Sequence, residues 1–173
     1  MDVIIANVYF CNSDWPNNNV KFWRYNIEGN NRDSLYPKDG RWRWMLFDTD
    51  WGFGYTGNED YKVDLLEKAS KVGSHGIIFS GLLKNDLFLD TFVKRFDYYL
   101  NGPFSPAFVK KNIEQFQSKL QPEMEEHINR WRLIGSVQKW NNNIDVLRDF
   151  AEKRNEIQKQ QLNKFVQNLK NKK

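Results

Sequence analysis

NSDWPNNN (residues 12–19) and DTDWGFG (residues 48–54) are the two stretches from which the fold of this chain is predicted. In the first, an aspartate precedes an asparagine by five residues, within a run of Asn, Ser, Asp and Pro that favours a loop. In the second, two aspartates stand two residues apart, and the two glycines after them allow a sharp turn. The rest of the chain is interpreted outward from these two stretches.

The segment between the two stretches has the pattern of a β-hairpin. Residues 20–25 and 42–48 are rich in aromatic residues and alternate as strands do. They flank a polar connection, residues 29–40, which ends in Asp39-Gly40, a strong turn signal. The second strand would end at Asp48 and Asp50, and because alternate residues of a strand share a face, both carboxylates would point to one side.

The remainder of the chain is predicted to be helical. Residues 2–11 indicate the end of a helix, with a strand as the alternative. Helices are expected over 86–101 with Asn85 as cap, from Pro106 after a Ser105 cap, and over about 143–169. Pro122 either kinks the helix that begins at Pro106 or begins a further helix that ends at about Trp131. In the last helix, five apolar residues at helical spacing should be buried together: Leu147, Phe150, Ile157, Leu162 and Phe165. The fold class is therefore α+β, a small β-hairpin packed on a mostly helical lobe, with residues 1–60 holding the loop and hairpin and 77–170 the helical part.

Composition and charge exclude several classes of function. The net charge is +4, but residues 152–173 alone carry +5, so the basic charge belongs to one helix end and indicates no nucleic-acid partner. No apolar run approaches the roughly 18 residues that a membrane span requires. The single cysteine, Cys11, has no partner for an internal disulfide and lies among apolar residues, so it is interpreted as a small buried thiol.

The spacing of Asp14 and Asn19 is that of the protein-kinase catalytic loop. In such a loop the aspartate accepts the proton of the acceptor hydroxyl, and the asparagine coordinates a metal ion bound to the phosphates. Asp14 is accordingly the candidate catalytic residue and Asn19 the candidate cofactor-binding and metal-binding residue. The alternative is an Asx turn that holds no ligand.

The pair Asp48 and Asp50 is the second candidate feature. Two carboxylates on one face repel each other unless a cation lies between them, and hard oxygen ligands suit Mg²⁺ or Mn²⁺. The alternative pairs Asp48 with Arg43 and makes Asp50 a cap of the turn at Gly52. The kinase C-terminal lobe has the same order of elements: a catalytic loop, a β-hairpin, and then a strand that ends in an aspartate followed by glycine. In kinases this is the aspartate of Asp-Phe-Gly, which holds the metal. Asp50 matches that aspartate if Asp50-Trp51-Gly52 takes the place of Asp-Phe-Gly. Asp48 matches it if the position is counted back from Phe53-Gly54. Both are therefore candidate metal ligands, and they remain unranked.

These stretches together resemble the CotH kinase family, atypical protein kinases similar to spore coat protein H. The resemblance rests on NSDW (12–15), NVKFWR (19–24), GRWRW (40–44) and DTDWGFG (48–54), and less specifically on LLKN (82–85), FSP (104–106) and PEMEEH (122–127). It implies a kinase-like C-terminal lobe that transfers the γ-phosphate of ATP to a protein hydroxyl with Mg²⁺ or Mn²⁺. It also implies a coat or surface protein as substrate, and a spore coat, cell-surface or extracellular location in bacteria or fungi.

The resemblance further implies a small lobe ahead of this region, with a glycine-containing loop and an ATP-binding lysine. No residue of this chain matches that lysine, so residues 1–173 are expected to be one incomplete domain that lacks its N-terminal lobe and is inactive alone. One alternative is a non-catalytic, pseudokinase-like structural or binding module of a coat or cell surface. Another is carbohydrate binding by the tryptophans of the first half: Trp15, Trp23, Trp42, Trp44 and Trp51.

Overall fold

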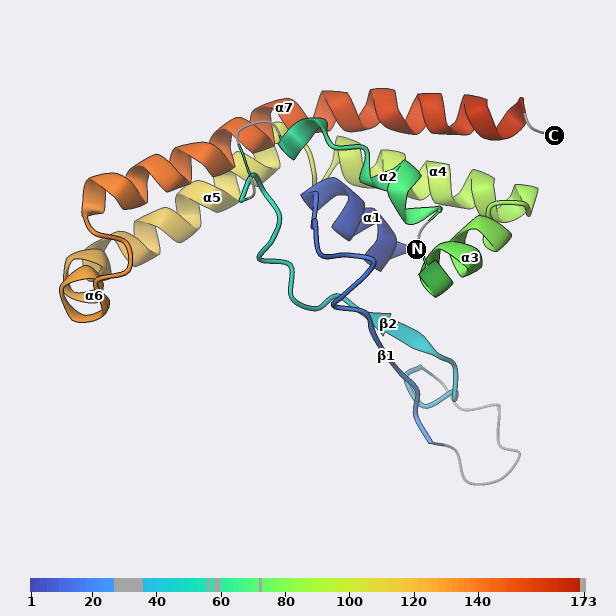
Figure 1. Ribbon diagram of the computed structural model, residues 1–173, viewed down its shortest axis with the longest axis horizontal. Helices are drawn as coiled ribbons and strands as arrows, with labels where there is room; N and C mark the ends of the chain where they lie inside the picture. Colours follow the sequence, from blue (N-terminus) through green and yellow to red (C-terminus); the bar gives the residue numbers. More distant parts are fainter. Residues whose placement is uncertain (27–35, 56, 58–59, 72, 172–173) are drawn as a thin grey trace.

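The computed structural model describes residues 1–26, 36–55, 57, 60–71 and 73–171. The fold is α+β: helices make up most of it, and two short antiparallel strands form a sheet (Figure 1). Along the chain the elements are α1 (Asp2–Phe10), β1 (Lys21–Trp23), β2 (Arg43–Met45), η1 (Asp60–Lys62), α2 (Leu65–Ala69), α3 (Gly73–Leu82), α4 (Asp86–Asn101), α5 (Pro106–Leu120), η2 (Gln121–Glu123), α6 (Met124–Trp131) and α7 (Val137–Lys170).

Side-chain caps fix where several helices begin. The Asn85 side chain accepts a hydrogen bond from the Phe88 amide at 3.0 Å, so α4 has the predicted bounds. Helix α5 begins at Pro106 as predicted, although the Ser105 side chain makes no capping bond. The cap of α7 is Ser136, which accepts from the Lys139 amide at 3.0 Å.

Other predicted bounds were wrong. Helix α7 begins at Val137 and not at residue 143, because Ser136 caps it and the helix continues through the asparagines at 141–143. The strands are three residues each, with Phe22 opposite Trp44, so β2 ends at Met45 and not at Asp48. Residues 60–82 contain η1, α2 and α3, which the sequence pattern did not predict.

Helix α1 lies at the centre of the helical body, next to α2 and α7, and α7 runs along one side of the whole body (Figure 1). The core includes Ile5, Val8 and Tyr9 of α1 together with residues of α2, α4 and α7. Of the five apolar positions predicted to be buried in α7, Phe150, Leu162 and Phe165 are buried, whereas Leu147 and Ile157 lie at the edge of the stripe and are half-buried. No described helix, α7 included, is both long and apolar enough to cross a membrane.

Arg154 of α7 is a fully buried residue within this core. Its guanidinium donates to the carbonyls of Val8 and Tyr9 at the end of α1, at 2.7 and 3.1 Å. It also donates to the carbonyls of Tyr61 and Val63, at 2.7 and 3.0 Å. One side chain therefore joins α7, the end of α1 and the segment around η1.

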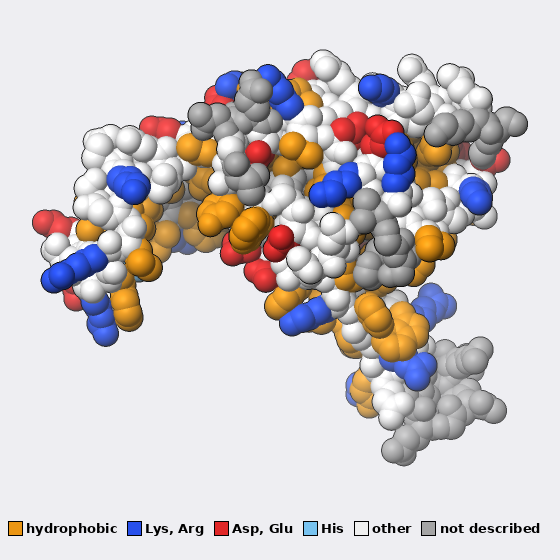
Figure 2. Space-filling model, viewed as in Figure 1, with side chains coloured by type: hydrophobic (Ala, Val, Ile, Leu, Met, Phe, Trp, Pro, Cys, Tyr) orange, Lys and Arg blue, Asp and Glu red, His pale blue; other side chains and the backbone are white. Residues whose placement is uncertain are grey.

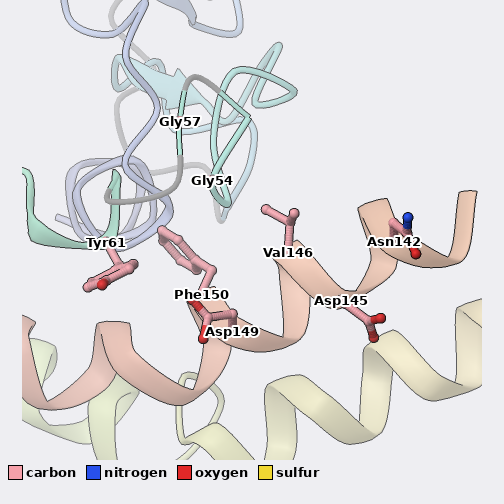
Figure 3. A pocket seen from close by; sticks show the side chains of 8 residues that line it. All are labelled: Gly54, Gly57, Tyr61, Asn142, Asp145, Val146, Asp149 and Phe150. Carbon is pink, nitrogen blue, oxygen red and sulfur yellow. The ribbon is translucent and has the colours of Figure 1, made fainter. Parts of the chain in front are cut away.

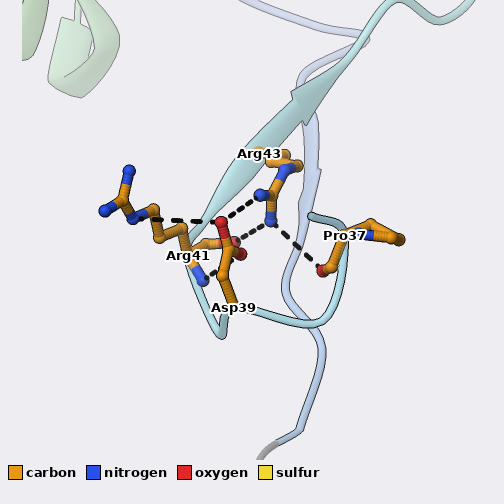
Figure 4. Close-up of polar contacts among 4 residues, drawn as sticks. All are labelled: Pro37, Asp39, Arg41 and Arg43. Carbon is orange, nitrogen blue, oxygen red and sulfur yellow. Dashed lines mark hydrogen bonds and ion pairs between the residues drawn. The ribbon is translucent and has the colours of Figure 1, made fainter. Parts of the chain in front are cut away.

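The described strands of the hairpin project away from the helical body (Figure 1), and Val20 and Trp44 are the described residues of 20–26 and 36–47 that pack against the core. Near its turn, Arg43 pairs with Asp39 at 2.6 Å and donates to the carbonyls of Arg41 and Pro37 at 3.0 and 3.5 Å (Figure 4). This hydrogen bond from Arg43 holds the pKa of the Asp39 carboxyl at about 2. Residues 27–35 of the predicted connection lie outside the described residues.

Phe150→Ala should lower the free energy of unfolding by about 3–5 kcal/mol, because the Phe150 ring is fully buried against Tyr9 and Phe53 and its removal leaves a cavity. Phe116→Ala on α5 is the matched control: that ring is 64% exposed, so its loss should cost less than about 0.5 kcal/mol. Urea denaturation of both variants measures the difference. Equal costs would show that the α7 stripe does not pack as described.

Candidate functional site

The loop that carries Asp14 begins at the C-terminal end of α1. Cys11 ends the helix in the left-handed conformation, with φ 54°, and the Asn12 amide donates back to the Asn7 carbonyl at 3.1 Å. The Asn18 amide donates to the Asp14 carbonyl at 2.9 Å, which closes the loop on itself. The Trp15 ring is buried in the core. The loop is thus held by the hydrogen bond at its start, by the hydrogen bond between Asn18 and Asp14, and by the buried Trp15 ring.

Asp14 and Asn19 meet across this loop. The Asn19 side-chain nitrogen donates to a carboxylate oxygen of Asp14 at 3.4 Å, although five positions separate the two residues. Asn19 adopts φ 56°, a left-handed conformation that asparagine tolerates better than most residues. The amide oxygen of Asn19, the atom that would bind a hard cation, therefore belongs to a group that lies beside the candidate base.

Asp48 and Asp50 lie in the loop after β2 and not on a strand. Asp48 has φ 52°, so the backbone turns at this residue, and the turn rather than strand alternation brings the two carboxyl groups together. The hydrogen bond between the two carboxyls raises the pKa of Asp48. Desolvation and the negative charges of Asp50 and Asp14 raise the pKa of this exposed carboxyl further, while Lys21 acts in the opposite direction. Three acids of two separate loops thus act on one another electrostatically.

The ion pair between Asp48 and Arg43, the alternative for this segment, is not formed. Arg43 instead pairs with Asp39 near the hairpin turn (Figure 4). The cation that acts on Asp48 is Lys21, whose ammonium group lies 3.4 Å from the centre of the Phe47 ring. The negative charge of Asp48 is therefore not paired with Arg43, which lies five positions earlier in the sequence.

The donor set fits a hard divalent cation. Carboxylates of Asp48 and Asp50 and the amide oxygen of Asn19 are the ligand types that Mg²⁺ and Mn²⁺ take, and the raised pKa of Asp48 records negative charge that a cation would offset. Within the described ranges, no three His, Cys, Asp or Glu side chains form a metal cage by themselves. Mg²⁺ characteristically binds one or two carboxylates and fills its other positions with water and phosphate oxygens.

A hollow of about 530 Å³ adjoins Asp50. Gly52, Phe53 and Tyr55 line one side of it, and residues of the first turns of α7, Trp140, Ile144 and Leu147 among them, line the other. Figure 2 shows acidic and apolar side chains next to each other on the face between the hairpin and the end of the body that carries α6. The hollow thus offers a mostly apolar surface next to a charged one.

A second hollow, of about 240 Å³, lies between Gly54 and α7 (Figure 3). Asp145 and Asp149 are among its lining residues, but each is paired: Asp145 with Arg148 at 2.8 Å and Asp149 with Lys153 at 2.7 Å. These acids are therefore not available to hold a cation in the way that Asp48 and Asp50 are.

The tryptophans of the first half have separate surroundings. Trp15 is buried, Trp42 packs edge-on against Phe22 with ring centres 5.3 Å apart, and the Arg43 guanidinium lies 5.6 Å from the Trp23 ring. Such contacts are those of a packed hairpin. They offer no support for a flat platform of indole rings that would bind a sugar.

Sequence reasoning missed two residues of this region. Asn12 is fully buried and donates a hydrogen bond to the Asp48 carbonyl at 3.1 Å. Lys21, on β1, is the cation that acts on Asp48. Asn12 lies in the first loop and Lys21 at the start of the hairpin, and both act on Asp48, which lies about thirty positions later in the chain. The sequence holds no local signal for contacts between residues so far apart.

The comparisons with known proteins agree with this region. The family model described as CotH kinase protein matches residues 1–158, which include both loops, the hairpin and the helices through most of α7. No curated protein and no solved structure matches the chain. Since the matched region covers far more than half of the sequence, the chain belongs to the CotH kinase family.

Proposed function

We propose that this chain carries the catalytic-base and metal-binding part of an atypical protein kinase, which transfers the γ-phosphate of ATP to a protein hydroxyl. One observation carries the proposal: Asp14 contacts Asn19 and acts electrostatically on Asp48, which is hydrogen-bonded to Asp50. Membership of the CotH kinase family supports the same reaction class. A base, an amide and two further acids side by side are the groups that phosphoryl transfer requires on one side of the triphosphate.

In this proposal Asp14 accepts the proton of the acceptor hydroxyl and orients its oxygen toward the γ-phosphorus. The new oxygen–phosphorus bond forms as the bond to the β-phosphate oxygen breaks, and ADP leaves. Asn19, Asp48 and Asp50 would hold Mg²⁺ or Mn²⁺, which offsets the charge on the phosphate oxygens. The acceptor segment would approach through the hollow beside Asp50.

Partners and location follow from the family. CotH proteins are associated with the spore coat, so the proposed substrate is a coat or surface protein and the proposed location is the spore coat, the cell surface or the extracellular space. The ATP-binding lysine and glycine-containing loop belong, in the proposal, to a lobe outside these residues. A pseudokinase-like structural module of the same surfaces is the competing function, and the variants below separate the two.

Asp14→Asn in the full-length protein should lower phosphate transfer by about 10²–10⁴-fold, because the amide cannot accept the proton. Transfer from labelled ATP to the protein itself and to casein, with Mg²⁺ and with Mn²⁺, measures the loss. Asp97→Asn, at an exposed position of α4, is the control and should keep full transfer. A wild-type protein without transfer would favour the pseudokinase, and an active Asp14→Asn variant would contradict the assigned base.

Asp48→Asn should abolish Mn²⁺ binding while raising, or leaving unchanged, the melting temperature of the metal-free protein. The pKa of Asp48 is raised, so its ionised form opposes folding at neutral pH, and this cost disappears as the pH falls through that pKa. Asparagine removes the charge and tolerates φ 52°. Calorimetry with and without Mn²⁺ tests both effects. A lower melting temperature together with a retained Mn²⁺ effect would assign Asp48 a structural role.

Residues 1–173 by themselves should show no detectable phosphate transfer and should bind ATP at best in the millimolar range. Loss of one preorganised electrostatic group typically costs about 10²–10³ in rate, and in this proposal all the groups on the other side of the triphosphate lie outside residues 1–173. The same transfer assay, run beside the full-length protein, measures this. Robust, Asp14-dependent transfer by residues 1–173 would refute the expectation.

A further inference from the structure

The side chain of Asn12 links the two loops of the candidate site. Asn12 is fully buried, and its side-chain nitrogen donates to the Asn7 side-chain oxygen at 2.9 Å and to the Asp48 carbonyl at 3.1 Å. Asn7, itself buried in α1, donates its own side-chain nitrogen to the Val3 carbonyl at 2.8 Å. Hydrogen bonds therefore run without a break from the first turn of α1 to the backbone of Asp48.

Backbone contacts bring the two loops close but do not reach Asp48. The Phe53 amide donates to the Phe10 carbonyl at 2.8 Å, and the Ser13 amide donates to the Trp51 carbonyl at 3.1 Å. A Cβ atom on Gly52 would lie 2.6 Å from the Phe10 carbonyl oxygen, so only glycine allows this crossing. Among the hydrogen bonds of the described residues, the one that joins the Asp14 loop to Asp48 itself comes from the Asn12 side chain.

Within the described part of the chain, the buried amide of Asn12 is satisfied on its donor side but not on its acceptor side. Both N–H groups of the Asn12 amide are used, but its side-chain oxygen is buried and has no hydrogen-bond partner among the described residues. An unpaired buried acceptor opposes folding, whereas an apolar residue of the same shape would leave the Asn7 side-chain oxygen and the Asp48 carbonyl without this donor. What the amide supplies, and an apolar side chain cannot, are two bonds: one to the Asn7 side chain of α1 and one to the Asp48 carbonyl of the second loop.

We propose that Asn12 is a positioning residue that sets the Asp48 carboxylate for metal binding. Its bond holds the Asp48 carbonyl while the backbone there turns through φ 52°, a conformation that few non-glycine residues adopt. The direction of the carboxylate depends on that turn. Since Asn12 lies two residues before Asp14, the same amide fixes the candidate base relative to the candidate metal ligand. The inference rests on the proposed function, because it assigns Asp48 a metal.

Asn12→Leu in the full-length protein tests the inference, because leucine keeps the shape of the side chain but donates nothing. Loss of a group that orients a metal ligand typically weakens metal binding by about 10–100-fold, so the Mn²⁺ dissociation constant, measured by electron paramagnetic resonance, should rise by that factor. The kcat of phosphate transfer should fall while the KM for the acceptor stays the same. Asn12→Ala serves as a second variant if the leucine variant does not fold.

Asn155→Leu is the matched control. Asn155 is also buried and also donates to two backbone carbonyls, those of Leu100 and Phe104 at 2.7 and 2.9 Å, but it lies on α7 away from both loops. It should lower stability and leave Mn²⁺ affinity unchanged. If both Asn12 variants bind Mn²⁺ with wild-type affinity while Asp48→Asn abolishes binding, the role of Asn12 is wrong but the assigned metal site stands. Unchanged Mn²⁺ binding in Asp48→Asn would overturn the inference and the assigned metal site together.

Discussion

The structure depends on one buried cation. Arg154 places its guanidinium among backbone carbonyls from two distant parts of the chain, and the carbonyls at the end of α1 carry the negative end of that helix dipole. Burial lowers the pKa of this guanidinium, so the hydrogen bonds are what make its charge tolerable in the core. The bond to Tyr9 occupies a carbonyl of the kind that a helix end leaves unpaired, while the Val8 carbonyl also accepts from the Cys11 amide at 3.3 Å. The loop with Asp14 therefore starts from a helix end that α7 holds in place.

The candidate site, formed by the two loops that follow α1 and β2, has two features that oppose folding. Of the five non-glycine residues with left-handed φ in the described part of the chain, four lie in the two loops: Cys11, Asn19, Asp48 and Phe53. Acidic groups of both loops also repel one another, as the raised pKa of Asp48 shows. Strained backbone and like charges persist where surrounding contacts over-determine them, and such clusters are typical of sites that act on ligands.

Sequence patterns predicted the parts of this molecule that local chemistry determines. The Asn85 cap and the Pro106 start gave the beginnings of α4 and α5, and the five-residue spacing identified Asp14 and Asn19, which do meet. Helices α2 and α3 were missed because residues 65–82 show no clear amphipathic period and contain three glycines. The bond from Asn12 to Asp48 joins residues 36 positions apart, and a contact of that kind depends on the tertiary fold alone.

The hairpin stands outside the helical body, while the residues around it at 10–14 and 48–53 are bound to each other. The chain segment between the two loops therefore leaves the helical body and returns to it, with both of its ends held in place. Doubling the length of such a segment costs only about 0.6 kcal/mol of loop-closure free energy, which is small compared with the free energy of the contacts that hold its ends. Insertions and deletions here can thus accumulate in evolution without moving the acids. The length of this part of the molecule is therefore free to vary, while the positions of the two loops from which it departs are not.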